Sequence, residues 1–154
     1  MTNWGKFESI DANELNKEVA ELKESNGDYP EIPHGTYEVK IAKMELRPTK
    51  KTGAPMLSVQ FKILEGEFKN MNLWMNQVIV MGDHNDKFRL HNANEFLRSL
   101  DTGIDIVFEG VRAYENLVAE VFEAVKDQGL EYAIEYGQNK NGYDIYRVKE
   151  VFAD

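Results

Sequence analysis

The sequence predicts an α+β fold, mainly β, in which a helical insert interrupts a series of five strands. Three observations support this prediction. Residues 36–80 contain three runs in which apolar and polar residues alternate, residues 84–128 show apolar residues at helical spacing, and two strand-like runs surround a polar, glycine-containing connection near the C-terminus. With 154 residues, of which 42% are hydrophobic, the chain suits one globular domain. We expect a single domain over residues 28–154, preceded by a helical segment over residues 1–27.

The first three strands are predicted at residues 36–47, 56–64 and 72–80. Apolar and polar residues alternate over residues 37–41 of the first strand and residues 57–63 of the second, so each strand should have one buried face and one solvent-exposed face. The third strand differs because a tryptophan lies on its more polar face, which holds Asn72, Trp74, Asn76 and Val78. We therefore regard Trp74 as a candidate functional residue, with burial beneath the helical insert as the competing interpretation.

Three segments have apolar residues at helical spacing. The first covers residues 11–25, with Asp11 as the N-cap and Asn26-Gly27 as a stop signal. The other two lie within the insert, at residues 88–100 and 113–127. Between them, residues 104–111 fit either a short strand or a loop.

The last two strands are predicted at residues 130–136 and 143–152, joined as a hairpin by the polar residues 137–142. A five-stranded OB-fold barrel has this order of elements: three strands, a helical insert and two more strands. That fold binds ligands on the face of its second and third strands and in the loops that join strands 1 to 2 and 4 to 5. We expect such a barrel here.

The net charge of -9 argues at first against a polyanionic ligand, but the charges are unevenly distributed. Residues 36–104 carry ten basic and eight acidic side chains, whereas acidic residues dominate on both sides of this segment. Five cations lie within twelve residues that contain a single acidic residue, Glu45; they are Lys40, Lys43, Arg47, Lys50 and Lys51. Two interpretations follow, a solvated strand edge that resists aggregation and an anion-binding surface.

Single-stranded nucleic acid requires cations along a groove and aromatic rings on which unpaired bases stack. Trp74 is the best stacking candidate, and Tyr143 is the second because it opens its strand beside a loop. For Tyr132 and Tyr136 we expect packing in the core. The predicted nucleic-acid-binding residues are Lys40, Lys43, Arg47, Lys50, Lys51, Lys62, Trp74, Lys140, Tyr143 and Arg147.

Motifs for catalysis and metal binding are missing from the sequence. It has no cysteine, which excludes disulfides, thiolate metal sites and a cysteine nucleophile. It has no phosphate-binding glycine motif, and His34, His84 and His91 lack the spacing of a zinc site. The segment 82–86 resembles a calcium loop only superficially, because the length and the terminal glutamate are absent. We expect no enzyme activity, no metal and no cofactor.

Several segments resemble a family of bacteriophage proteins from DNA replication and recombination modules that are described as single-stranded-DNA-binding proteins. The resemblance involves Asp28-Tyr-Pro-Glu-Ile-Pro-His-Gly-Thr-Tyr-Glu-Val, residues 51–70, Met75-Asn-Gln-Val, the N-terminal Asn-Trp-Gly-Lys-Phe and the closing Tyr-Arg-Val-Lys-Glu-Val. It implies an OB-fold protein that coats single strands in the cytoplasm of a bacterial host. It also implies a phage helicase, polymerase or recombinase as partner, and allows for a homo-oligomer.

Our leading hypothesis is sequence-independent binding of single-stranded DNA. The alternative is a protein-interaction module, such as a recombinase or helicase loader or an inhibitor of a host protein, in which an OB-like barrel binds polypeptide. The acidic helical segments favour that alternative, and a phage structural protein is a third hypothesis. No run reaches the roughly 18 apolar residues of a membrane span, so we expect no membrane contact.

Overall fold

The computed structural model describes residues 11–16 and 32–153, which fall into two compact units, Met1–Pro33 and His34–Asp154. In the first unit residues 12–16 are helical. Asp11 caps this turn because its Oδ1 accepts hydrogen bonds from the backbone N–H groups of Asn13, at 3.0 Å, and Glu14, at 3.1 Å. The predicted N-cap is therefore confirmed. The rest of the predicted helix and residues 28–31 lie outside the described residues.

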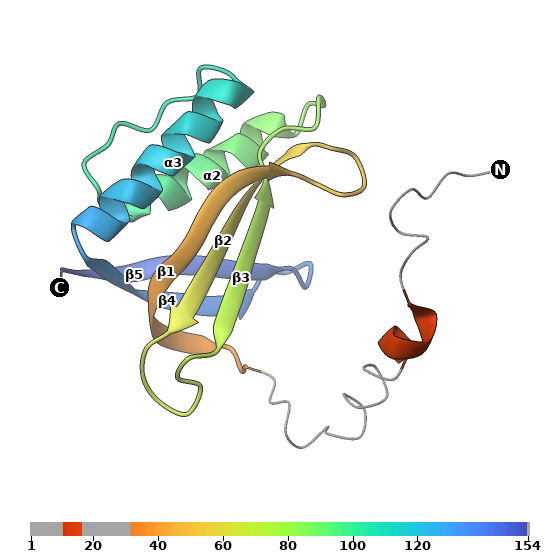
Figure 1. Cartoon of the computed structure of the whole chain (residues 1–154). Helices are drawn as coiled ribbons and strands as arrows, with labels where there is room; N and C mark the ends of the chain where they lie inside the picture. Colours follow the sequence, from red (N-terminus) through yellow and green to blue (C-terminus); the bar gives the residue numbers. More distant parts are fainter. Residues whose placement is uncertain (1–10, 17–31, 154) are drawn as a thin grey trace. The chain divides into compact units, whose positions relative to one another are not determined.

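The second unit is a mixed α+β structure with an antiparallel five-stranded sheet and two helices between its third and fourth strands (Figure 1). The class and the order of elements are as predicted, and residues 104–110 form a loop. The sheet is open, with the order β3-β2-β1-β4-β5, so the closed barrel that we expected is not confirmed. The elements are β1 Gly35–Pro48, β2 Pro55–Ile63, β3 Asn72–Val78, α2 Asp86–Ser99, α3 Val111–Asp127, β4 Leu130–Gln138 and β5 Asp144–Ala153.

A bulge at Ala42 determines which face of β1 is basic. The register with β2 passes from Ile41↔Phe61 directly to Lys43↔Gln60, so Ala42 has no partner. Strict alternation would place Lys40 and Lys43 on opposite faces of the strand. The extra residue returns Lys43 to the face of Lys40, while apolar residues before and after the bulge remain in the core.

The core lies between the sheet and the two helices. Helix α3 packs on β1, and α2 packs near β3 and β5. Phe61 of β2 meets Phe96 of α2 edge to face, with ring centroids 6.0 Å apart. The two helices are joined by the Tyr114 hydroxyl, which donates to Asn94 Oδ1 at 2.7 Å, and burial raises the pKa of Tyr114 to about 12. These contacts hold α2 beside the two edge strands.

Tyr132 joins β4 to the end of α2 through a buried hydrogen bond. Its side chain is fully buried, as predicted, and its hydroxyl donates to the Leu100 carbonyl at 2.8 Å. We expect Tyr132→Phe to lower the free energy of unfolding by about 1–2 kcal/mol, because the buried carbonyl loses this donor. Urea denaturation measures the change. Tyr143→Phe, at an exposed position, is the control, and equal stability of all three proteins would contradict the prediction.

The segment 82–86 starts α2 through an ion-pair cluster. Arg89 donates to Asp83 Oδ1 at 2.6 Å and to Asp86 Oδ1 at 2.7 Å. Asp86 also accepts the backbone N–H groups of Met81, at 2.7 Å, and Gly82, at 2.9 Å. The pKa of Asp83 is lowered mainly by the hydrogen bond from Arg89. The pKa of Asp86 is lowered mainly by the hydrogen bond from the Met81 backbone N–H. Both carboxylates thus have protein partners.

This cluster predicts a pH dependence of stability. Because both pKa values lie below the ordinary value of 3.8 in the folded protein, the cluster stabilises the fold above that pH. Its contribution is lost as the pH falls through the lowered values. We expect the difference in Tm between the wild type and Asp86→Asn to be constant near neutral pH and to shrink below about pH 4. Thermal unfolding across this range tests it; a difference that persists in acid would contradict it.

Candidate nucleic-acid interface

The outer face of β1, β2 and β3 brings together five of the predicted residues. Lys40 of β1 lies opposite Lys62 of β2, which lies opposite Asn72 of β3. In the next row Lys43, Gln60 and Trp74 are partners across the same strands. We call this surface the basic face; its residues are Lys40, Lys43, Glu45, Arg47, Gln60, Lys62, Asn72, Trp74 and Asn76.

Lys40 and Lys62 are the most informative pair on the basic face. They are direct cross-strand partners, and within residues 32–153 neither forms a salt bridge. Like charges directly opposite each other destabilise an antiparallel pair. Lys43 differs because its Nζ lies 3.5 Å from a carboxylate oxygen of Glu45. The arrangement of Lys40 and Lys62 thus carries a cost in the isolated protein that an anion would offset.

Trp74 is on the surface. Its side chain is 48% exposed, so it is not buried beneath the helical insert, and that interpretation of the sequence is wrong. It projects from β3, an edge strand, next to Gln60. A large exposed aromatic ring in a row with Lys43 fits the stacking role that the sequence predicted.

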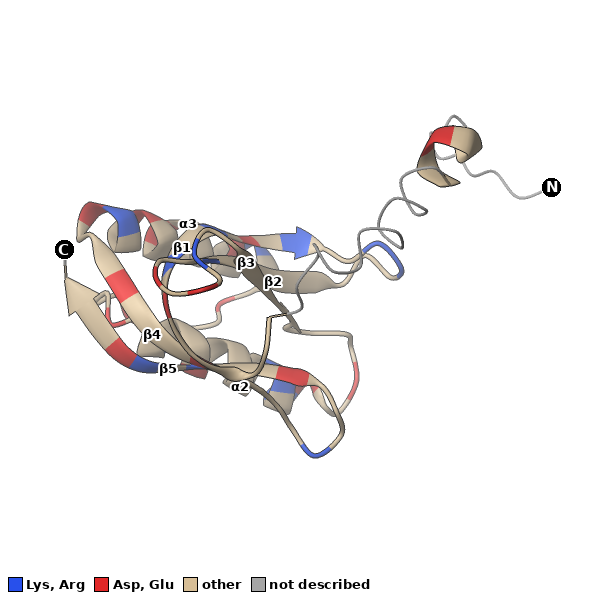
Figure 2. Cartoon of the chain, turned by 90° about the horizontal axis from the view of Figure 1, so that it is seen from below, with Lys and Arg blue, Asp and Glu red and all other residues tan. Residues whose placement is uncertain are grey.

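The loop between β1 and β2 presents Lys50 and Lys51 at one end of the basic face. Thr49 Oγ1 and Thr52 Oγ1 are 2.8 Å apart, and the Gly53 N–H donates to the Thr49 carbonyl at 3.0 Å. Gly53 has a φ of 76°, which glycine adopts readily. The two lysines are exposed at the tip of this ordered turn. Figure 2 shows basic positions at the end of β1 and in this loop.

The loop between β4 and β5 carries Lys140. Asn139 orders this loop, because its Oδ1 accepts the backbone N–H groups of Asn141, at 2.9 Å, and Tyr143, at 3.1 Å. Lys140 is exposed at the tip, and Tyr143 follows with 70% of its side chain exposed. The loop therefore provides a cation and a ring at the start of β5.

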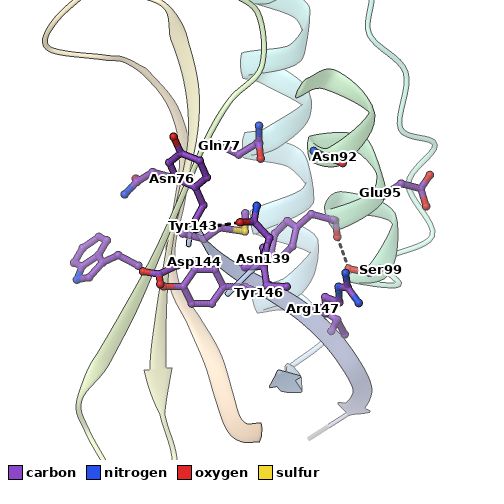
Figure 3. A pocket seen from close by; sticks show the side chains of 15 residues that line it. Asn76, Gln77, Asn92, Glu95, Ser99, Asn139, Tyr143, Asp144, Tyr146 and Arg147 are labelled. Atoms are coloured by element: carbon purple, nitrogen blue, oxygen red, sulfur yellow. Dashed lines mark hydrogen bonds between the residues drawn. The ribbon is translucent and has the colours of Figure 1, made fainter. Parts of the chain in front are cut away.

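A cleft of about 770 Å³ separates the edge strands β3 and β5 and is bounded by α2 (Figure 3). Trp74 and Asn76 belong to both the basic face and this cleft. Tyr143 and Arg147 line its other side. The full lining is Trp74, Met75, Asn76, Gln77, Asn92, Glu95, Phe96, Ser99, Asn139, Tyr143, Asp144, Ile145, Tyr146, Arg147 and Val148.

A family model described as a protein of unknown function (DUF669) matches residues 18–132. The chain belongs to the DUF669 family. No curated protein and no solved structure matches it. The matched region includes β1, β2, β3 and both helices, so it contains the whole basic face. It ends at Tyr132, and the part of the cleft that β5 contributes lies beyond it.

Tyr146 forms a rigid wall of the cleft in this DUF669 chain. Its ring stacks on Tyr136 of β4, with centroids 5.1 Å apart and planes 8° from parallel. The ring of Phe61 also packs against Tyr146, with ring centroids 5.7 Å apart. Burial raises the pKa of Tyr146. Tyr136 is half-buried and meets His34 edge to face, so it lies at the margin of the core and not within it as we expected.

Arg147 lies apart from the basic face of the DUF669 chain. Its cross-strand partner is Glu135, which also lies 3.6 Å from Lys149. The same side of β4 and β5 carries Glu131 and Glu150. The charge of Glu65 is the main reason that the pKa of Glu38 is raised, and the charges of Glu131 and Glu150 raise it further. The outer surface of β4 and β5 is therefore acidic, and Arg147 joins the candidate site only through the cleft.

Sequence reasoning missed the amide side chains of the cleft in the DUF669 chain. Asn76, Gln77, Asn92 and Asn139 come from β3, α2 and the loop after β4. No spacing motif connects residues from three separate elements. The polar character of β3 was a partial indication of these amide groups in the sequence. On this strand Asn76 accepts a hydrogen bond from the buried Ser58 hydroxyl at 3.0 Å.

Two features are absent from the part of the chain that the structure describes. There, no three His, Asp or Glu side chains are grouped closely enough to hold a metal ion. No helix of residues 11–16 and 32–153 combines the length and the apolar character needed to cross a bilayer.

Proposed function

We propose that this protein binds single-stranded DNA across the basic face. The observation that carries the proposal is the pairing of Lys40 with Lys62, beside the exposed ring of Trp74. Cations along one sheet face supply phosphate contacts, and an exposed ring supplies a platform for an unpaired base. Neither type of contact depends strongly on base identity, so binding across this face is largely independent of sequence.

The loops extend the path of the strand. Lys50 and Lys51 lie at the β1–β2 end of the basic face, while Lys140 and Tyr143 lie beyond β3 on the other side of the cleft. A single strand that crosses β2 and β3 meets cations at both ends and Trp74 between them. Duplex DNA has no exposed base faces to stack on these rings, so the single strand is favoured.

The strand order supports an OB-type architecture. The order β3-β2-β1-β4-β5, with every neighbouring pair antiparallel and the helices between β3 and β4, is that of an OB fold opened between β3 and β5. These two edges approach each other, and Phe61 of β2 reaches Tyr146 of β5. OB folds bind oligonucleotides on the face of their second and third strands and in the two neighbouring loops, which supports our choice of the basic face and of the β1–β2 and β4–β5 loops.

We extend the proposal to a biological role in phage DNA replication or recombination. Its support is the resemblance of residues 28–39, 51–70 and 75–78 to single-stranded-DNA-binding proteins of such modules. In that role the protein covers single strands in the bacterial cytoplasm and works beside a helicase, polymerase or recombinase.

Fluorescence anisotropy tests the binding proposal. A labelled thymidine oligonucleotide and a labelled duplex of the same length are titrated with the protein at low and moderate salt. We expect binding of the single strand that weakens with salt, with a slope of log affinity of about -0.7 for each phosphate neutralised. Absence of single-strand binding at low salt would overturn the proposal and direct attention to a polypeptide ligand.

A further inference from the structure

We infer that the cleft between β3, β5 and α2 binds one nucleobase of the single strand and gives that position a base preference. This inference rests on the proposed function and assigns a specific role to a cavity that general phosphate binding does not require.

The cleft has room for a base together with its sugar and phosphate, and its position connects it to the basic face. Its volume of about 770 Å³ lies within the range of roughly 300–1,000 Å³ typical of small-molecule sites. Trp74 and Asn76 line it and also belong to the basic face. A base next to one stacked on Trp74 can therefore enter the cleft while its phosphates remain near the lysines.

Rings are available on the β5 side of the cleft. Tyr143 is 70% exposed, and Figure 3 shows it reaching toward Asn76 of β3. Tyr146 lines the cleft as well, but its ring is packed against Tyr136 and Phe61. The exposed ring of Tyr143 is therefore the one that can cover a face of a planar base.

The amide groups provide hydrogen-bonding atoms for a base edge. Gln77 uses its Nε2 to donate to the Val78 carbonyl at 2.9 Å, which leaves its Oε1 as an acceptor. Asn139 uses its Oδ1 for two backbone N–H groups, which leaves its Nδ2 as a donor. Asn92 has no hydrogen bond from its side chain to any other described residue. Donors and acceptors together match the edges of unpaired bases.

Arg147 supplies the charge that a nucleotide in the cleft requires. It lines the cleft, is exposed and takes part in no salt bridge within residues 32–153. Two acidic residues also line the cleft: Glu95 of α2, which is paired with Arg98 at 2.7 Å, and the exposed Asp144 of β5, which has no salt bridge within residues 32–153. A phosphate beside the bound base therefore finds a guanidinium group available for a bidentate contact.

The test compares base preference with overall affinity. Anisotropy titrations use four single-stranded oligonucleotides of equal length, a thymidine series in which one central base is replaced by adenine, cytosine or an abasic position. The proteins are the wild type, Asn92→Leu and, as the matched control, Asn116→Leu at an exposed position of α3. Thermal unfolding of each variant verifies that it is folded.

We expect the wild type and Asn116→Leu to distinguish the central base by about 5- to 10-fold, the effect of one or two hydrogen bonds, and to bind the abasic strand most weakly. Asn92→Leu should lose this discrimination while keeping the salt-dependent affinity. Equal affinity of the wild type for all four strands would overturn the inference and leave the proposed function intact. Failure of every strand to bind would overturn both.

A second measurement isolates the cleft. The chain has two tryptophans, Trp4 and Trp74, so Trp4→Phe makes Trp74 the only one. We expect deoxynucleoside monophosphates to change its fluorescence saturably, with an affinity that Asn92→Leu lowers about 5-fold and that Asn116→Leu leaves unchanged. A saturable response to an extended peptide, with none to any nucleotide, would instead show that the open edges of β3 and β5 bind polypeptide and would overturn the inference.

Discussion

Trp74→Ala is expected to weaken the binding of single-stranded DNA by about 5- to 150-fold, because stacking of one base contributes roughly 1–3 kcal/mol. The fold should be unaffected, since the side chain is 48% exposed on the outer face of an edge strand. Anisotropy titration measures the affinity, and thermal unfolding of the free variant measures its stability.

Two further variants separate stacking from general effects of losing a ring. Trp74→Phe retains an aromatic face and should recover a large part of the lost affinity. Phe152→Ala removes another partly exposed ring, 38% exposed, from β5, where its cross-strand partner is Glu131; it should bind as the wild type does. Unchanged affinity in Trp74→Ala would remove this residue from the interface.

The second large effect is expected from Lys40→Gln combined with Lys62→Gln. If each lysine neutralises one phosphate, the salt slope should fall in magnitude by about 1.4, that is, about 0.7 for each contact. The free protein should become more stable, by about 0.2–1 kcal/mol, because the two charges face each other across the strands. Binding and stability thus change in opposite directions, which a purely structural role of these lysines would not produce.

The matched control is Lys126→Gln combined with Lys149→Gln, which changes the net charge equally. These lysines lie near Glu123, at 2.9 Å, and Glu135, at 3.6 Å, away from the basic face. The control should leave the affinity for single strands nearly unchanged. Equal losses in both double variants would show that net charge alone, and not the basic face, governs binding.

Local patterns were sufficient to predict the five strands and the two helices of the insert, because burial on one face imposes a period on each element. The bulge at Ala42 was not predicted, although the apolar positions change parity between Ile41 and Met44. That change is the sequence signal for the bulge. It matters for function because it brings Lys40 and Lys43 to one face.

The site was predictable only where its residues belong to one contiguous sheet region. Lys62 and Trp74 follow from alternation along β2 and β3, but the exposure of Trp74 depends on where the helical insert packs, which no local pattern determines. The cleft depends on how closely β3, β5 and α2 approach one another. Its amide residues, such as Asn92 and Asn139, could not be recognised before that arrangement was known.

The acidic composition is compatible with the proposed ligand because the charges are separated on the sheet. The outer side of β4 and its neighbours carries acidic residues, among them Glu38 and Glu135. The adjoining part of β1 and β2 carries Lys40 and Lys62. The boundary falls between Glu38 and Lys40 within one strand. A single strand can therefore bind to the basic face, while the acidic surface repels other parts of the same polyanion.

Backbone amide NMR shifts, followed while the 17.7 kDa protein is titrated with a short thymidine oligonucleotide, would locate the bound strand residue by residue. We expect the largest shifts in β2, β3 and the β1–β2 loop, with a change in the side-chain indole signal of Trp74. Shifts confined to α3 and the acidic side of β4 and β5, with the basic face unchanged, would contradict it.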